Sequence, residues 1–148
     1  MYKTSLHEAH AEIDRIYFDI LPKHAMEVRE GQIALCHTML DAFADKNISL
    51  CHAGVGIGKT AAYLIAAVIW NKYQPDGLGG DDFSPFLIAT SSIALQNAII
   101  EDYIPRLSEI LCAEGVIDEP FTGILRKGKG NYVCPRRLAR RIETMNPE

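Results

Sequence analysis

The sequence lacks any apolar stretch long enough to cross a membrane. Its longest apolar run extends from Ala61 to Trp70, whereas a spanning helix needs about 20 such residues. The first residues are polar and do not form a secretion signal. These absences favour a cytoplasmic protein with no membrane partner.

Cysteine is also scarce, and none of the four cysteines stands in a Cys-x-x-Cys pair. Without signs of secretion, we do not expect a disulfide framework. Cys36, Cys51 and Cys112 are predicted to be free, buried thiols. His7 and His10 lie three residues apart in a predicted helix, but no further ligands cluster near them. Solvent-facing histidines are therefore expected there, rather than a metal site.

Charge is unevenly distributed along the chain. Of the 15 Lys and Arg residues, seven lie between Arg126 and Arg141, where no acid occurs, while all 19 acids lie elsewhere. A cationic segment in an acidic body indicates a polyanionic partner. The alternative is a solvated helix face. The basic residues of this segment are Arg126, Lys127, Lys129, Arg136, Arg137, Arg140 and Arg141.

Apolar periodicity predicts an α/β domain. Helices are expected at 5–21, 31–45, 59–73, 92–111 and 138–145, the fourth of them kinked near Pro105. Short strands are expected at 48–51, 86–89 and 121–125, and a loop at 75–85. Because strands alternate with helices, the expected architecture is a parallel sheet flanked by helices.

Residues 53–60 carry the phosphate-loop pattern, with alanine in place of the first glycine. Glycines allow several backbone N–H groups to turn toward one phosphate. The Lys59 ammonium is expected to reach the β- and γ-phosphates and the Thr60 hydroxyl to ligate Mg²⁺, which makes these two the catalytic candidates. The alternative is a glycine turn with an incidental lysine. The predicted ATP-binding residues here are Ala53, Gly54, Val55, Gly56, Ile57, Gly58, Lys59 and Thr60.

The segment before this loop resembles the Q motif of superfamily 2 helicases, in which alanine often begins the phosphate loop. The segment reads Val-Arg-Glu-Gly-Gln over residues 28–32. The resemblance implies that Gln32 reads the adenine edge through paired hydrogen bonds and that Arg29 belongs to the same nucleotide site. Taken alone, Gln32 is a polar residue at a helix start.

Two further stretches look like the DinG/XPD helicases. Residues 88–96, Ile-Ala-Thr-Ser-Ser-Ile-Ala-Leu-Gln, are similar to motif Ia, which implies nucleic-acid contacts at Thr90, Ser91 and Gln96. Hydroxyls and amides at a helix start suit a phosphate. The alternative is plain helix capping by Ser91 or Ser92.

Residues 127–134, Lys-Gly-Lys-Gly-Asn-Tyr-Val-Cys, resemble the segment that leads into the iron–sulfur domain of this family. The resemblance implies that Cys134 is the first of four ligands to a [4Fe–4S] cluster in the full-length parent, and no complete cluster is expected in this chain. Single-stranded DNA is the implied partner of the segment. Its candidate contacts are Arg126, Lys127, Lys129, Tyr132, Arg136, Arg137 and Arg140.

The sequence also departs from the family pattern. Val55 and Ile57 stand where threonines are usual, and the catalytic Asp-Glu-x-His motif is absent. Residues 116–119, Val-Ile-Asp-Glu, substitute poorly because few apolar residues precede the acids and a proline follows.

Residues 1–148 are therefore expected to be the N-terminal part of a RecA-like helicase motor domain, truncated before its remaining motifs. The implied parent couples ATP hydrolysis to DNA unwinding, and this chain alone is expected to be inactive. Alternatives are another P-loop ATPase or kinase, or a catalytically silent nucleotide-binding module. The sequence predicts no oligomeric state.

Overall fold

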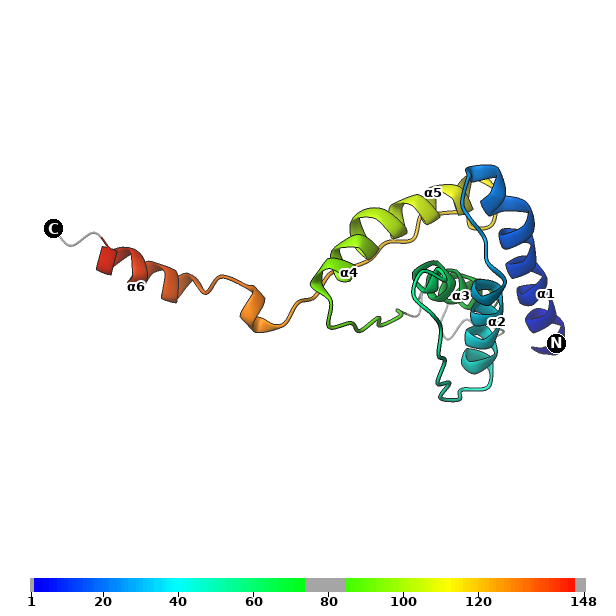
Figure 1. The fold of residues 1–148 in the computed structure, drawn as a ribbon, viewed down its shortest axis with the longest axis horizontal. Helices are drawn as coiled ribbons and strands as arrows, with labels where there is room; N and C mark the ends of the chain where they lie inside the picture. Colours follow the sequence, from blue (N-terminus) through cyan, green and yellow to red (C-terminus); the bar gives the residue numbers. More distant parts are fainter. Residues whose placement is uncertain (1, 74–84, 146–148) are drawn as a thin grey trace.

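A computed structural model describes residues 2–73 and 85–145, and these residues are helical or irregular (Figure 1). Two π-helical turns, Ile16–Ile20 and Ile99–Tyr103, and two 3-10 turns, Leu21–His24 and Lys129–Asn131, adjoin the α-helices. The α-helices are α1 (Tyr2–Arg15), α2 (Glu30–Ala44), α3 (Lys59–Tyr73), α4 (Ile93–Ala98), α5 (Ile104–Ala113) and α6 (Pro135–Met145).

The predicted α/β fold with a parallel sheet is wrong for the described residues, which contain no strand. The three segments predicted as strands lack regular structure and form no ladder. Their apolar side chains lie largely in solvent: Ile48 is 102% exposed, Leu87 94% and Ile124 85%. A strand exists only through the neighbours that accept and donate its hydrogen bonds. A local apolar pattern therefore cannot by itself establish one.

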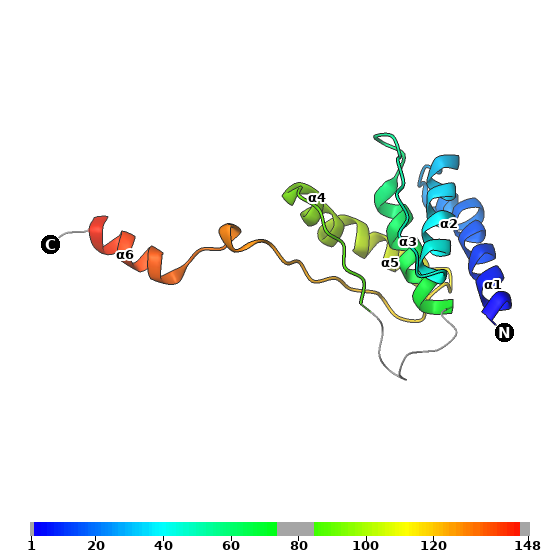
Figure 2. The ribbon, with the colours of Figure 1, turned by 90° about the horizontal axis from the view of Figure 1, so that it is seen from below.

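The core lies where α1, α2 and α3 pack side by side, as Figure 2 shows. Leu107 and Leu111 of α5 join this core. Alanines at 61, 62 and 66 are buried on α3, and their small side chains allow neighbouring helices to approach closely. The largest fully buried aliphatic and aromatic side chains are Ile13, Ile16, Tyr17, Ile20, Leu21, Leu40, Ile65, Ile69, Leu107 and Leu111.

The helix predicted near 92–111 is confirmed, and so is its interruption near Pro105. Residues 99–103 form a π-helical turn directly before α5, and Pro105 lies in the first turn of that helix. Proline has no N–H to donate to the preceding turn. The wider π-helical turn accommodates this change in the hydrogen-bond pattern.

The chain from residue 124 onward leaves the helical core and ends in α6, which projects away from the remaining helices (Figures 1 and 2). α6 has no buried residue. The loop predicted at 75–85 falls almost entirely outside the described residues. In the part of the chain that the structure covers, no helix combines the length and apolarity that a bilayer crossing requires.

Candidate nucleotide-binding site

The glycine loop at 53–60 lies between an irregular segment and the start of α3, and two of its three glycines adopt left-handed backbone conformations. Gly56 has φ of +80° and Gly58 has φ of +87°, in the left-handed region that side-chain-bearing residues avoid. A Cβ on Gly58 would also lie 2.6 Å from Gln32 Nε2. The backbone angle therefore favours glycine at position 58, and any side chain there would also displace the Gln32 amide.

The Lys59 ammonium folds back over the loop. Its Nζ donates to the carbonyl oxygens of Gly54 at 2.7 Å and Ala53 at 3.1 Å. α3 begins at Lys59, and Ala62 N already donates to Gly58 O at 3.2 Å. The N–H groups at the start of a helix lack partners within that helix and carry partial positive charge. A lysine and a helix N-terminus therefore meet at one end of the loop.

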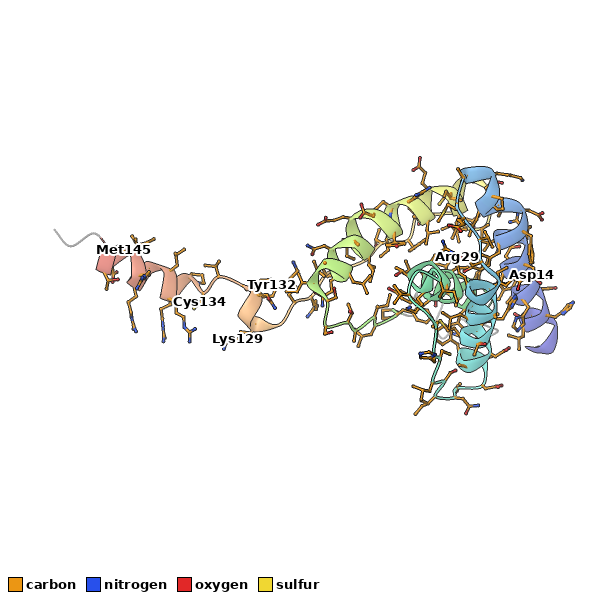
Figure 3. All side chains as sticks on the ribbon, in the orientation of Figure 1. Asp14, Arg29, Lys129, Tyr132, Cys134 and Met145 are labelled. Carbon is orange, nitrogen blue, oxygen red and sulfur yellow. The ribbon has the colours of Figure 1, made fainter. Side chains whose placement is uncertain are left out.

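The start of α2 contacts the loop at three successive positions. Arg29 donates from its guanidinium to Gly56 O and to the Glu27 carboxylate (Arg29 is labelled in Figure 3). Two residues later, Gly31 packs so tightly against the loop that a Cβ there would lie 2.4 Å from Ile57 Cδ1.

Gln32 makes the third contact, through Nε2, which donates to Gly58 O at 3.2 Å. The side chain is only 3% exposed, and its Oε1 has no hydrogen-bond partner among the described residues. The amide nitrogen thus supports the loop, and the amide oxygen is left as an unused acceptor.

Thr60 lies in the first turn of α3, half-buried. Burial raises the pKa of the Tyr63 phenol, one turn further along, and the Thr60 hydroxyl acts on that pKa in the opposite direction. The possible catalytic acids of residues 116–119 give no support to hydrolysis. Asp118 and Glu119 are exposed in the irregular segment after α5, not at the end of a buried strand.

The segment similar to motif Ia forms a helix cap. Ser92 Oγ accepts a hydrogen bond from Leu95 N at 3.2 Å, which confirms the capping alternative for Ser92. Thr90 Oγ1 accepts from Ser92 N at 3.2 Å, and Gln96 Nε2 donates to Thr90 O at 3.0 Å. Thr90 and Gln96 thus stabilise the turn before α4, and Ser91 lies exposed within it.

The cationic segment is exposed throughout α6, where the long side chains extend into solvent (Figure 3). Tyr132 is 57% exposed, and its hydroxyl accepts from Lys127 N at 3.0 Å. No cation of this segment takes part in an ion pair recorded for the described residues, so its charge faces solvent. The loop and this segment lie at different places in the fold, and the structure does not bring them together.

The cysteines do not converge on one site. Cys36 is buried, Cys112 is half-buried, and Cys51 and Cys134 are exposed. The predicted burial is therefore right for Cys36 and wrong for Cys51, which lies in the unpaired segment before the loop. Within 2–73 and 85–145, no three His, Cys, Asp or Glu side chains are grouped in a way that could hold a metal ion.

The prediction of solvent-facing histidines is wrong for His10. Its ring contacts His37 and Asp41 on α2, and the ring itself is partly buried. A repeated pattern in the sequence, His-x-x-x-Asp at 10–14 and again at 37–41, is the signal that could have revealed this contact.

Comparison with known proteins identifies relatives of the chain among bacterial helicases. The probable ATP-dependent helicase YpvA of Bacillus subtilis is 26% identical over 141 residues, which are 95% of this chain and 20% of that protein. The 3'-5' exonuclease DinG of the same organism is 32% identical over 73% of this chain and 10% of its own length. The ATP-dependent DNA helicase DinG of Photobacterium profundum is 26% identical over 99% of this chain and 19% of its own.

No family model matches the chain, and no solved structure is detectably similar to it. The chain spans between 10% and 20% of the length of the curated relatives named above. The chain is therefore a distant homologue of the DinG and YpvA helicases, matching a short part of them.

Proposed function

We propose that this chain is the ATP-binding part of an ATP-dependent DNA helicase, with the loop at 53–60 as its triphosphate site. The observation that carries the proposal is the three-point contact between the start of α2 and the loop. Arg29 bonds Gly56 O, Gly31 packs against Ile57, and Gln32 bonds Gly58 O. Relatives named as ATP-dependent helicases support the same reading.

The loop suits a phosphate group because of its backbone. Positive φ at Gly56 and Gly58 turns the peptide groups, and successive N–H groups in such a turn form a concave anion site. The unpaired N–H groups at the start of α3 add to it. When a phosphate enters, Lys59 exchanges its carbonyl partners for phosphate oxygens, which bind an ammonium more strongly.

The free Oε1 of Gln32 supports adenine as the base. A buried acceptor without a partner is destabilising by about 1 to 3 kcal/mol. This oxygen is closed to solvent, so the 6-amino group of adenine would supply the missing donor once the start of α2 moves to admit the base. Because Gln32 Nε2 is already bound to Gly58 O, the contact would link the base to the phosphate loop through one side chain.

Mg²⁺ fits this site only together with ATP. Thr60 offers a single hydroxyl, and Mg²⁺ is commonly held by one or two protein oxygens plus phosphate oxygens and water.

An iron–sulfur cluster does not fit the chain as it stands. Cys134 is the one cysteine of the cationic segment, and such a cluster needs four thiolates.

Single-stranded DNA is the proposed partner of the cationic segment. Exposed arginines on α6 can replace the counterions condensed on a nucleic acid, and Tyr132 is exposed enough to stack on a base.

ATP titration of the chain and of two lysine variants tests the proposed function. Lys59→Ala should abolish binding, because the loop loses its ammonium. Lys72→Ala is the matched control, since Lys72 lies at the other end of α3 and pairs with Glu12, and it should bind as the parent does. Equal affinity in all three proteins would refute the phosphate site.

Phosphate release by the same proteins tests whether binding leads to hydrolysis. The parent chain should turn over far more slowly than about 1 per second, the lower end for working enzymes. Faster turnover in the purified chain would show that a catalytic acid has been overlooked.

A further inference from the structure

α1 and α2 each carry the same short pattern, a histidine followed four residues later by an aspartate. The pairs are His10 with Asp14 on α1, and His37 with Asp41 on α2. Residues four apart share one face of a helix. Each histidine contacts the aspartate of the other helix. This crossed arrangement requires the two helices to run antiparallel at the contact.

The four side chains form one continuous chain of hydrogen bonds. His10 Nε2 lies 2.9 Å from Asp41 Oδ1, and His37 Nε2 lies 2.9 Å from Asp14 Oδ1. Between them, the two Nδ1 atoms are 2.7 Å apart. The rings are 28% and 24% exposed as side chains, so the network is partly shielded from water.

The two rings meet edge to edge. Their centroids are 4.9 Å apart, with 25° between the ring planes. The distance between the centroids is longer than the 2.7 Å between the Nδ1 atoms. The difference is close to two ring radii, one for each ring. The Nδ1 atoms must therefore point directly at each other. That geometry suits a proton between them, and it leaves no room for a metal ion.

Counting protons defines the charge state of this network. Carboxylates only accept hydrogen bonds, so each Nε2 must carry a proton. A neutral imidazole has one N–H, so two neutral rings would then face each other with two lone pairs. Two fully protonated rings would face each other with two N–H groups. Only one additional proton, shared by both Nδ1 atoms, satisfies all three contacts.

We propose that His10 and His37 form an interhelical proton-binding site that holds a single shared proton and fastens α1 to α2. The pair then carries one positive charge between two carboxylates, Asp14 and Asp41. The third helix of the bundle, α3, contributes only Lys59 and Lys72 as charged residues, and Lys72 pairs with Glu12. Arg15 bonds the same carboxylate. The other titratable residues of α1 nearest His10 in the sequence are His7 and Glu8.

The bond between the helices depends on the count of protons in the pair. Loss of the shared proton places two lone pairs in contact, and gain of a second proton places two N–H groups in contact. Either change breaks the bond between the helices.

Nitrogen NMR of the full chain with labelled histidines tests the proposal directly, at about pH 6.5, where histidine is ordinarily half protonated. His10 and His37 should both show a protonated Nε2, and their Nδ1 signals should move to the average of the protonated and unprotonated positions. In His37→Gln, the Nδ1 signal of His10 should lose this averaging. His24, bonded to Glu114, should keep its signals and so report an intact fold.

Thermal unfolding of the parent and four variants gives an independent measurement. His10→Gln and His37→Gln should each lower the midpoint at about pH 6.5, and the double variant should lower it no further than the larger single loss. His52→Gln, in an exposed loop position, should leave the midpoint unchanged. Additive losses, independent Nδ1 signals, or stoichiometric zinc binding that is lost in His37→Gln would each overturn the shared proton.

Discussion

The side-chain nitrogen of Gln32 donates to the carbonyl oxygen of Gly58 at 3.2 Å and so joins the start of α2 to the glycine loop at 53–60. The two residues are 26 positions apart in the sequence. This bond holds Gly58 in a conformation that only glycine adopts readily. The same amide group therefore supports the loop and carries the oxygen that we propose for contact with the base.

Replacing Gln32 by alanine should weaken ATP binding roughly tenfold, the effect of about 1.4 kcal/mol. The variant loses the donor to Gly58 O and the acceptor proposed for adenine. Competition between ATP and GTP provides the measurement, since guanine presents the opposite donor and acceptor pattern. A parent chain that binds both nucleotides equally, with no change in the variant, would rule out base recognition by Gln32.

Gly58→Ala should remove nucleotide binding, whereas Gly54→Ala should largely preserve it. Gly58→Ala places a side chain on a residue with φ of +87° and against Gln32. In contrast, a Cβ on Gly54 would meet nothing within 4 Å. The left-handed conformation alone costs about 1 to 2 kcal/mol. Titration with a fluorescent ATP analogue measures both variants. Equal affinities would mean that the loop rearranges before it binds.

Reversal of charge at Arg136, Arg137 and Arg140 to glutamate should weaken binding of single-stranded DNA and flatten its dependence on salt. Each phosphate contact contributes to the slope of affinity against salt concentration. A matched control reverses Lys23, Lys46 and Arg106, which are exposed outside the cationic segment. The two variants have the same net charge, so equal weakening would indicate general attraction rather than a site on α6.

Acid should destabilise the fold partly through Glu12. Burial alone would raise the pKa of this carboxyl, but hydrogen bonds and ion pairs with Arg15 and Lys72 outweigh it and lower the pKa. A lowered folded-state pKa stabilises the protein above the unfolded value, about 4.3, and this stabilisation is lost as pH falls through the folded value.

Glu12→Gln should therefore show a smaller fall in unfolding midpoint than the parent between neutral pH and about pH 3, on either side of that loss. Glu109→Gln, at an exposed position on α5, serves as the control and should fall as the parent does. A parent-like fall in the Glu12 variant would show that the two ion pairs do not form in solution.

The helices could be predicted from the sequence because their determinants are local. The apolar run after Lys59 and the proline at 105 fixed the positions of α3 and of the interruption between α4 and α5. Glycines at 56 and 58 likewise indicated a loop with unusual backbone angles. Contacts between distant residues were harder to foresee. The adenine role suggested for Gln32 contained no sign that its nitrogen would bind Gly58, and the repeated His-x-x-x-Asp pattern has meaning only once α1 and α2 are adjacent.

The extended segments near Ile48, Leu87 and Ile124 have a practical consequence for handling the chain. Each exposes apolar side chains together with backbone N–H and C=O groups that form no ladder within the described residues. Such segments are templates for pairing with other copies, especially where they are β-branched and carry little charge. We expect turbidity to rise with protein concentration, and charged substitutions at Leu50 or Leu87 to delay it.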